Sequence, residues 1–273
     1  MIKKTSVVIL IVLLIMSVSV LAQPDNAEGY DIPVDIKING IHLKTPAVSI
    51  IQDGSVYVPV RALCEALGAQ VIWDEKTETA SIIKGDISMV FSDDTTNLQA
   101  YRSIMYNDCL FAPVRLIAES FGLTVEWDQT LYNVLITADN IQIPTEFVDT
   151  AAYCDDDVIL LAKLIYAEVG SGSFNEMLGI GGVVMNRIRS VHYPSTISGV
   201  IYDTNWSVQF PPAFEEDFHR QPSGMAIIAA KCVMHGVNIV GGSTGFGIAD
   251  DTDSWISQNM DLVCTYGNIS FYE

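Results

Sequence analysis

Residues 58–74 read VPVRALCEALGAQVIWD, and residues 112–128 read APVRLIAESFGLTVEWD. The second stretch repeats the first, with Pro, Val, Arg, Glu, Gly, Val, Trp and Asp in the same places. Such self-similarity indicates a duplicated supersecondary unit. Each copy predicts a strand, a short helix, a strand, a turn and a strand, with the proline opening the helix and Gly68 or Gly122 closing it.

The regions around the repeat set the domain boundaries. Asn39-Gly40 and Asp53-Gly54 predict hairpin turns between short β-rich runs, so the module is placed at residues 34–137. Residues 138–154 lack helical periodicity and are interpreted as a linker, followed by a second domain at 155–273. We expect the two parts to fold separately and limited proteolysis to cut the linker.

The duplicated VPVR…E..G..V.WD core resembles the copper amine oxidase-like N-terminal domain common in secreted Gram-positive proteins. The resemblance implies a noncatalytic α+β module that binds the cell wall or another protein. Copper is not expected despite the name, because this half holds one histidine, His42, and no ligand cluster. The shared arginine, Arg61 or Arg115, is either a structural ion-pair partner or a ligand contact.

The stretch LLAKLIYAEVGSGS, residues 160–173, is the end of an apolar helix that carries one glutamate, Glu168. The helix is expected to begin at residues 155–157, three aspartates that suit its positive end. A helix apolar nearly all round is a central one, so the carboxyl is expected in a buried or cleft-facing position. Desolvation and the negative end of the helix dipole would then raise its pKa, as a general acid requires. The alternative is a solvated residue at a fraying helix end.

The rest of the second half predicts a helix-rich domain. Ser173 and Glu176 form a capping box that starts the next helix. Gly179, Gly181 and Gly182 are poor helix formers, and we expect close packing against the first helix to favour them. A short helix, a second buried helix and a β-rich end are predicted within residues 192–203, 224–236 and 262–273.

Five fragments in order resemble the spore-cortex-lytic cell wall hydrolase family over residues 157–272: LLAKLIYAEVG, GGVVMNRI, YPSTISGVIY, VQF and YGNISFY. The resemblance implies a lysozyme- or lytic-transglycosylase-like fold that cuts peptidoglycan glycan strands. It aligns Glu168 with the family's catalytic glutamate. It also makes Tyr166, Gln209 and Phe210 candidate substrate-binding residues. The overall fold class predicted is α+β, with a duplicated β-rich module before a helix-rich domain.

The sequence departs from the family pattern at two places. Val169 replaces the usual arginine, and Thr244–Ala249 replaces an aromatic segment of the sugar cleft. These losses leave open a noncatalytic wall-binding protein with a decayed lytic domain. Retention of a buried acid favours an enzyme instead, because burying a carboxyl is costly.

One acid is enough for a lytic transglycosylase. Glu168 would protonate the leaving glycosidic oxygen and then accept the proton of the muramic acid 6-hydroxyl, which closes a 1,6-anhydro ring. A glycosidase needs a second carboxylate, and Asp203, Glu215, Glu216 and Asp217 are available. No cofactor is expected for either reaction.

Two other enzyme classes fit less well. A cysteine peptidase would use Cys154, but three aspartates follow it and oppose a thiolate. A zinc amidase would need His192, His219 and His235 to converge, and their spacing matches no known zinc motif.

Charge and the N-terminus bear on partners and location. The formal net charge is −19 with no basic cluster, so nucleic acid is a poor partner and a neutral glycan a better one. Lys3 and Lys4, the apolar run 7–20 and the small residues before Gln23 predict a cleaved signal peptide, residues 1–22. No cysteine follows for a lipid anchor. We therefore expect an extracytoplasmic protein without a stable membrane span.

Overall fold

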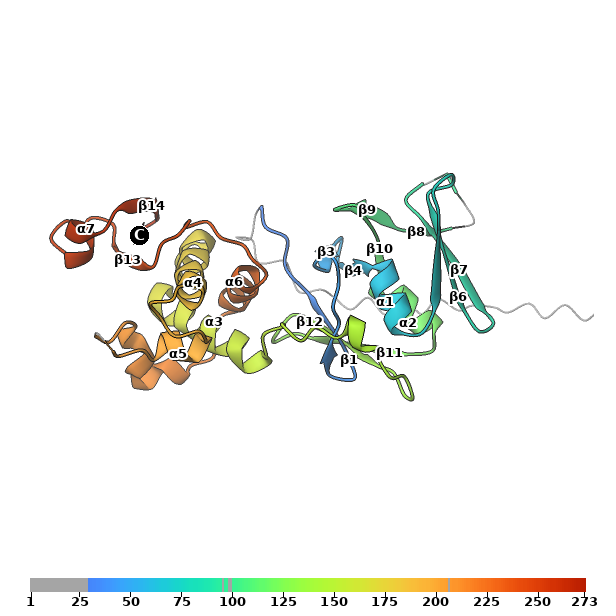
Figure 1. The fold of residues 1–273 in the computed structure, drawn as a ribbon, viewed down its shortest axis with the longest axis horizontal. Coiled ribbons are helices and arrows are strands. Elements are labelled where there is room, and N and C mark those ends of the chain that lie inside the picture. The colour runs from blue at the N-terminus through green and yellow to red at the C-terminus, as the bar shows by residue number, and fades with distance from the viewer. Residues whose placement is uncertain (1–28, 95, 98–99, 206) are drawn as a thin grey trace, which may run out of the picture.

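The computed structural model describes residues 29–94, 96–97, 100–205 and 207–273. The predicted signal peptide, residues 1–22, lies outside them. The molecule is elongated, with a helical domain at one end and a β-rich module at the other (Figure 1). None of the helices in the described ranges is long and apolar enough to cross a membrane.

The module contains three four-stranded sheets with the strand orders β11-β12-β1-β2, β3-β4-β10-β9 and β5-β6-β7-β8. Two short helices, α1 (Val60–Ala66) and α2 (Val114–Ser120), accompany the sheets. The strands are β1 (Asp35–Ile38), β2 (Ile41–His42), β3 (Ile50–Gln52), β4 (Ser55–Pro59), β5 (Gln70–Asp74), β6 (Thr79–Lys84), β7 (Ile87–Ser92), β8 (Tyr101–Arg102), β9 (Ile104–Tyr106), β10 (Cys109–Pro113), β11 (Thr124–Asp128) and β12 (Asn133–Thr137).

The duplication predicted from the sequence is visible in the fold. The first copy runs β4–α1–β5–β6 and the second runs β10–α2–β11–β12. Each helix follows a proline and is closed by a glycine of positive φ, Gly68 or Gly122. Arg61 and Arg115 each pair with the glutamate four residues on and donate to a carbonyl of the following strand. Within each copy this arginine therefore holds the helix to its strand.

The first strand of the module closes it against the last. β1 pairs with β12 in parallel, and Asp35 lies opposite Asn133. Apolar residues from both copies and from β1 form one buried cluster, which includes Ile38, Leu63, Phe91 and Ile117. The parallel pairing brings the two ends of the module to one sheet at the side nearest the helical domain (Figure 1).

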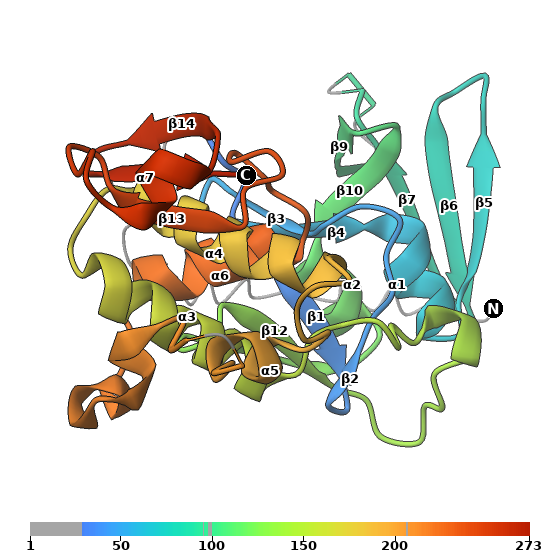
Figure 2. The same cartoon turned by 60° about the vertical axis from the view of Figure 1, so that its left-hand side comes forward.

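The helical domain is built on α3, α4 and α6, which contact one another in all three pairings. A three-stranded sheet, β13-β15-β14, lies against α4 (Figure 2). Its helices are α3 (Asp155–Val169), α4 (Phe174–Arg189), α5 (Ile197–Ile201), α6 (Gly224–Met234) and α7 (Trp255–Asn259), with 3-10 turns η2 (Pro211–Phe214) and η3 (Glu216–His219). Its strands are β13 (Gly245–Ile248), β14 (Leu262–Tyr266) and β15 (Ile269–Tyr272). The α+β class predicted from the sequence is confirmed.

The capping box at Ser173 and Glu176 is present as predicted. The glycines of α4 were expected to allow close packing against α3, and the structure supports this only in part. A Cβ on Gly179 would lie 2.2 Å from the ring of Phe271 in β15, and one on Gly182 would meet Val240. Only at Gly181 does α3 contribute, through Ile165, and Val233 of α6 lies closer. The glycines admit neighbours from distant parts of the chain rather than the first helix alone.

The region interpreted as a linker, residues 138–154, follows the module for most of its length. It contains the 3-10 turn η1 (Thr145–Phe147), and Val148 forms a β-bridge with Leu43. The backbone N–H of Asp149 donates to the carbonyl of His42 at 3.0 Å. Backbone pairing with the module therefore continues to Asp149, five residues before the last residue of the predicted linker.

Candidate active site

Glu168 lies in the last turn of α3, and Gly170 ends the helix with a φ of 62°. The helix is central, because Leu161, Leu164 and Ile165 are fully buried against α4 and α6. A residue at this point is held by a packed helix rather than by a mobile loop, as an acid–base group requires. The structure thus places the carboxyl at the C-terminal end of a well-packed helix.

The carboxyl of Glu168 is in an unfavourable environment for a negative charge. Its Oε1 is buried, and it makes no hydrogen bond to any group in the described part of the chain. Burial raises the pKa of Glu168 from 4.5 to about 7, Arg187 opposes the rise, and the charge of Glu215 adds to it. The raised pKa expected from the sequence is confirmed, with desolvation as the largest cause. Such a carboxyl can hold a proton near neutral pH and release it.

Arg187, on α4, is a cation whose charge acts on this carboxyl. The side chain is buried, and its guanidinium lies over the rings of Tyr193 and Phe210, with Cζ 5.0 and 4.9 Å from the ring centroids. Its Nε donates to the carbonyl of Thr244 at 2.8 Å. Nη1 is buried without a hydrogen-bond partner among the described residues. Burial lowers the pKa of Arg187 from its usual value, and nearby Tyr193, Asp203 and Glu168 oppose that effect.

Glu168 and Arg187 do not form an ion pair in the described structure, since none of the ion pairs within 4.0 Å there joins them. Each therefore has a buried polar atom without a protein partner. Buried polar atoms are normally hydrogen-bonded, and a catalytic role is one explanation for an exception. An unpartnered donor and an unpartnered acid are groups that a ligand with oxygen atoms can satisfy.

The segment Thr244–Ala249, in which the sequence departs from the family pattern, lies beside this arginine. Thr244 supplies the carbonyl that holds Arg187, and Phe246 stacks on Phe210 at 6.0 Å. The segment therefore keeps an aromatic ring near the site. Phe210 is 0% exposed, which leaves its ring beneath the guanidinium rather than at a surface. A direct sugar contact by Phe210 does not fit this position, and support of Arg187 does.

Tyr166 lines a cavity of about 290 Å³ between α3 and the segment 212–220. Ala167 and Gly170 on either side of Glu168 line it too, as do Glu215 and Arg220. Gln209 is partly exposed, and its amide donates to the hydroxyl and the carbonyl of Ser207, both at 3.1 Å. The structure places Tyr166 in the wall of this cavity, and Glu168 is not among the described residues that line it. The amide of Gln209 is engaged locally.

The residues that a cysteine peptidase or a zinc amidase would use make other contacts in the structure. The thiol of Cys154 donates to Asp157, and His235 bonds Asp35 of the module. His219 ends η3, and His192 is exposed after α4. Their roles as nucleophile or zinc ligands gain no geometric support from the described residues.

Arg187 was missed by the sequence reasoning, although it lies in the fragment GGVVMNRI. A charged residue in a stretch that otherwise reads as buried helix was the available signal. An acid of near-neutral pKa, a buried arginine and aromatic rings near the end of a central helix are groups suited to general acid–base chemistry.

Comparison with known families agrees with both halves of this description. Residues 171–272 match the Cell Wall Hydrolase family. Residues 37–102 and 91–171 match the Copper amine oxidase N-terminal domain. Both resemblances inferred from the sequence are confirmed. Glu168 lies just before the first residue of the Cell Wall Hydrolase match.

The copper implied by the second family name has no fitting donor set. Among the described residues no group of three or more His, Cys, Asp and Glu side chains could hold a metal ion. His42 is the one histidine of the module, and a single imidazole does not make a copper site.

The chain is also similar to spore cortex-lytic enzymes. It is 27% identical to that of Halalkalibacterium halodurans over 107 residues, which are 39% of this chain and 32% of the relative. It is 25% identical to that of Bacillus cereus over 105 residues, 38% of this chain and 39% of the relative. The matched segment thus spans between 32% and 39% of these curated relatives.

Two solved structures are similar to this chain. They are the catalytic domain of the Bacillus cereus SleB protein and that of the germination-specific lytic transglycosylase SleB from Bacillus anthracis. Each is 21% identical, covers 46% of this chain and has a TM-score of 0.41. The match takes in 98% and 100% of the respective solved chains.

Proposed function

We propose that this protein is a peptidoglycan-cleaving enzyme, a lytic transglycosylase that cuts the glycan strand beside muramic acid. The observation that carries the proposal is the buried carboxyl of Glu168, with its pKa of about 7 and an Oε1 that lacks a partner in the described structure. The Cell Wall Hydrolase match over 171–272 and the spore cortex-lytic relatives supply the substrate class.

Glu168 acts first as an acid and then as a base in this proposal. The protonated carboxyl gives its proton to the leaving glycosidic oxygen, and the C1–O bond breaks with the bonding electrons on that oxygen. The carboxylate then accepts the proton of the muramic acid 6-hydroxyl as its oxygen bonds to C1. The 1,6-anhydro ring forms, Glu168 is protonated again, and water is not consumed.

Arg187 and Tyr166 assist at the same site. The charge of Arg187 stabilises the carboxylate that exists between the two steps, because it lowers the pKa of Glu168. Tyr166 lies at the edge of the neighbouring cavity and would contact a sugar there. Phe210 supports Arg187 from below, and Gln209 stays a candidate contact if its amide releases Ser207.

The location and the partners follow from the substrate. Peptidoglycan lies outside the cytoplasm, so we propose that residues 1–22 direct export and that the protein acts on wall or spore cortex. The module at 34–137 would bind the wall or another protein. No role for nucleic acid is proposed, since the chain has a net charge of −19.

The test is loss of lytic activity in Glu168→Gln, which keeps the shape of the side chain but cannot deliver a proton. Release of soluble fragments from peptidoglycan should fall about a hundredfold or more. Asp156→Asn, at the exposed start of the same helix, is the control and should keep activity. An active Glu168→Gln variant would show that Glu168 is structural. An unmutated protein that binds peptidoglycan without cutting it would indicate a decayed lytic domain.

A further inference from the structure

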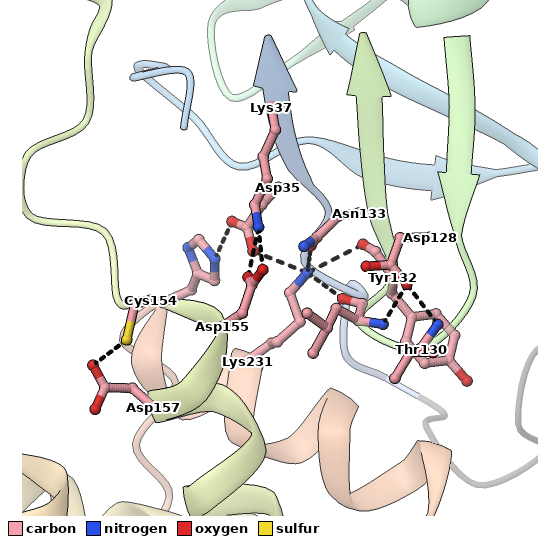
Figure 3. A network of polar contacts seen from close by, with 12 residues as sticks. Asp35, Lys37, Asp128, Thr130, Tyr132, Asn133, Cys154, Asp155, Asp157 and Lys231 are labelled. Carbon is pink, nitrogen blue, oxygen red and sulfur yellow. Dashed lines mark hydrogen bonds and ion pairs between the residues drawn. The ribbon is translucent and has the colours of Figure 1, made fainter. Parts of the chain in front are cut away.

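Lys231 of α6 lies at the contact between the helical domain and the module (Figure 3). The residue is 1% exposed, and its ammonium group is surrounded by acceptors from the module. Nζ donates to the carbonyls of Leu131 and Tyr132 at 2.9 and 3.1 Å and to Oδ1 of Asn133 at 2.7 Å. It also pairs with Asp35 at 2.9 Å. A buried ammonium ion is costly unless its protons are satisfied, so this is a specifically built contact.

Leu131, Tyr132 and Asn133 belong to the turn between β11 and β12 and the start of β12, and this turn also makes an apolar contact. Leu131 is 6% exposed and belongs to the core of the helical domain, together with Ile32 from just before β1. The hydroxyl of Tyr132 lies 2.6 Å from where a Cβ on Gly224 would be, at the first residue of α6. The missing side chain at Gly224 lets the turn approach the helix closely.

The equivalent turn in the first copy of the repeat, between β5 and β6, has a similar backbone conformation. Glu78 and Tyr132 occupy equivalent positions, with φ of 49° and 54°. In each copy an aspartate before the turn, Asp74 or Asp128, accepts backbone N–H groups from the residues two and three positions on. The backbone of the two turns is therefore set by the same local hydrogen bonds.

The side chains of the two turns differ at the positions that make the contact. Thr77-Glu78-Thr79 in the first copy stands where the second has Leu131-Tyr132-Asn133. Thr77 and Glu78 are exposed, and the hydroxyl of Thr79 is bonded to that of Thr77. The first copy thus has neither the apolar anchor nor the amide acceptor that Lys231 uses.

Two further contacts lie beside the turn on β1. Lys37 donates to the carboxylate of Asp155, the first residue of α3, at 2.7 Å to Oδ2. His235 bonds the other oxygen of Asp35 at 3.0 Å. Burial pushes the pKa of Asp35 up, but the hydrogen bond from His235 and the charge of Lys231 hold it well below its usual range. The contact therefore involves both α3 and α6.

We propose that the turn Leu131–Asn133, together with β1, is a docking surface that fixes the helical domain on the module. One copy of the duplicated unit has become this docking element, and the other has not. The turn of the first copy is exposed at Thr77 and Glu78 instead. This assignment does not depend on the reaction at Glu168, which lies at the opposite end of α3 from Asp155.

An exchange of turn sequences in the full chain tests the proposal. The variant L131T/Y132E/N133T gives the second copy the turn of the first, whose backbone it already shares. We expect protease to cut this variant after Asp149 at least about tenfold faster than the unmutated chain. The exchange removes a hydrogen bond to the charged Lys231, and a loss of about 1.4 kcal/mol corresponds to tenfold in the opening equilibrium. The calorimetric unfolding transition should also separate into two.

The matched control is T77L/E78Y/T79N, the reverse exchange in the first copy, which should leave cleavage and unfolding unchanged. If the exchanged chain does not fold, two single variants make the same comparison. Asn133→Ala removes the acceptor of one Lys231 hydrogen bond and should speed cleavage, and Thr79→Ala, at the equivalent position of the first copy, should not. Equal cleavage rates and transitions for the second-copy variant, the first-copy variant and the unmutated chain would overturn the proposal.

Discussion

At the scale of single residues, Glu168 holds its proton more tightly in the folded protein than in the unfolded chain. Its pKa is raised from 4.5 to about 7, with burial as the largest cause. A raised pKa means that the stabilising contribution of this group is complete below about pH 4.5 and is lost as the pH rises to about 7. Above that pH the folded protein contains an ionised carboxyl in a poor environment.

This linkage predicts the stability of Glu168→Gln. The variant should match the unmutated protein near pH 4.5 and exceed it at pH 8, by at most about 3 kcal/mol of unfolding free energy. Urea unfolding at the two pH values measures the difference. A variant less stable than the unmutated protein at pH 8 would mean that the carboxylate makes favourable contacts in the fold.

Arg187 predicts a shift in the pH dependence of activity. Its charge lowers the pKa of Glu168, so Arg187→Met should raise that pKa and reduce the rate. The raised pKa of Glu168 predicts an alkaline limb of kcat/KM near pH 7 in the unmutated protein. That limb should move to higher pH in Arg187→Met and move less in Arg187→Lys.

Arg189→Met, at an exposed position on the same helix, is the control and should leave the pH profile in place. A profile that stays in place when Arg187 is replaced by Met would show that the two groups do not interact.

At the scale of elements, local sequence signals predicted most of the fold. The repeats, the capping box and the start of α3 at Asp155 were predicted because each rests on contacts between residues close in sequence. The partners of the α4 glycines were predicted poorly, because Phe271 and Val240 are far from them in the chain. Arg187 and Lys231 were not singled out for a similar reason, since their partners come from distant loops.

The glycines of α4 give a prediction at this scale. Gly179→Ala should destabilise the protein by about 1–3 kcal/mol, because the new methyl group would overlap the buried ring of Phe271. Gly182→Ala should be close to neutral, since Val240 presents only a methyl group and alanine favours the helix by about 1 kcal/mol. Denaturant unfolding of both variants measures the contrast. Equal effects would mean that the ring of Phe271 moves aside at little cost.

At the scale of the whole molecule, two buried clusters divide the chain, and the polar and apolar contact around Lys231 and Leu131 joins the two parts. The division into 34–137 and 155–273 is a proposal based on the repeat and on these clusters. Sequence patterns could not indicate how the parts meet, because that contact depends on the three-dimensional position of one turn.

This arrangement predicts where protease cuts the folded chain. Residues 143–149 are tied to the module by a buried Ile143, a β-bridge and backbone hydrogen bonds. Cleavage should therefore concentrate at 150–153 rather than across the whole of 138–154. Mass analysis of the first fragments measures the site. Early cuts scattered through both halves would contradict the two-part division.

The central claim is that one carboxyl, Glu168, performs both proton transfers and that water takes no part. The most direct measurement is mass analysis of the fragments that the purified protein releases from peptidoglycan. The account predicts fragments that end in 1,6-anhydromuramic acid, one water lighter than hydrolysis products, and none from Glu168→Gln. Fragments with ordinary reducing ends would contradict it, because they would require a second carboxylate to activate water.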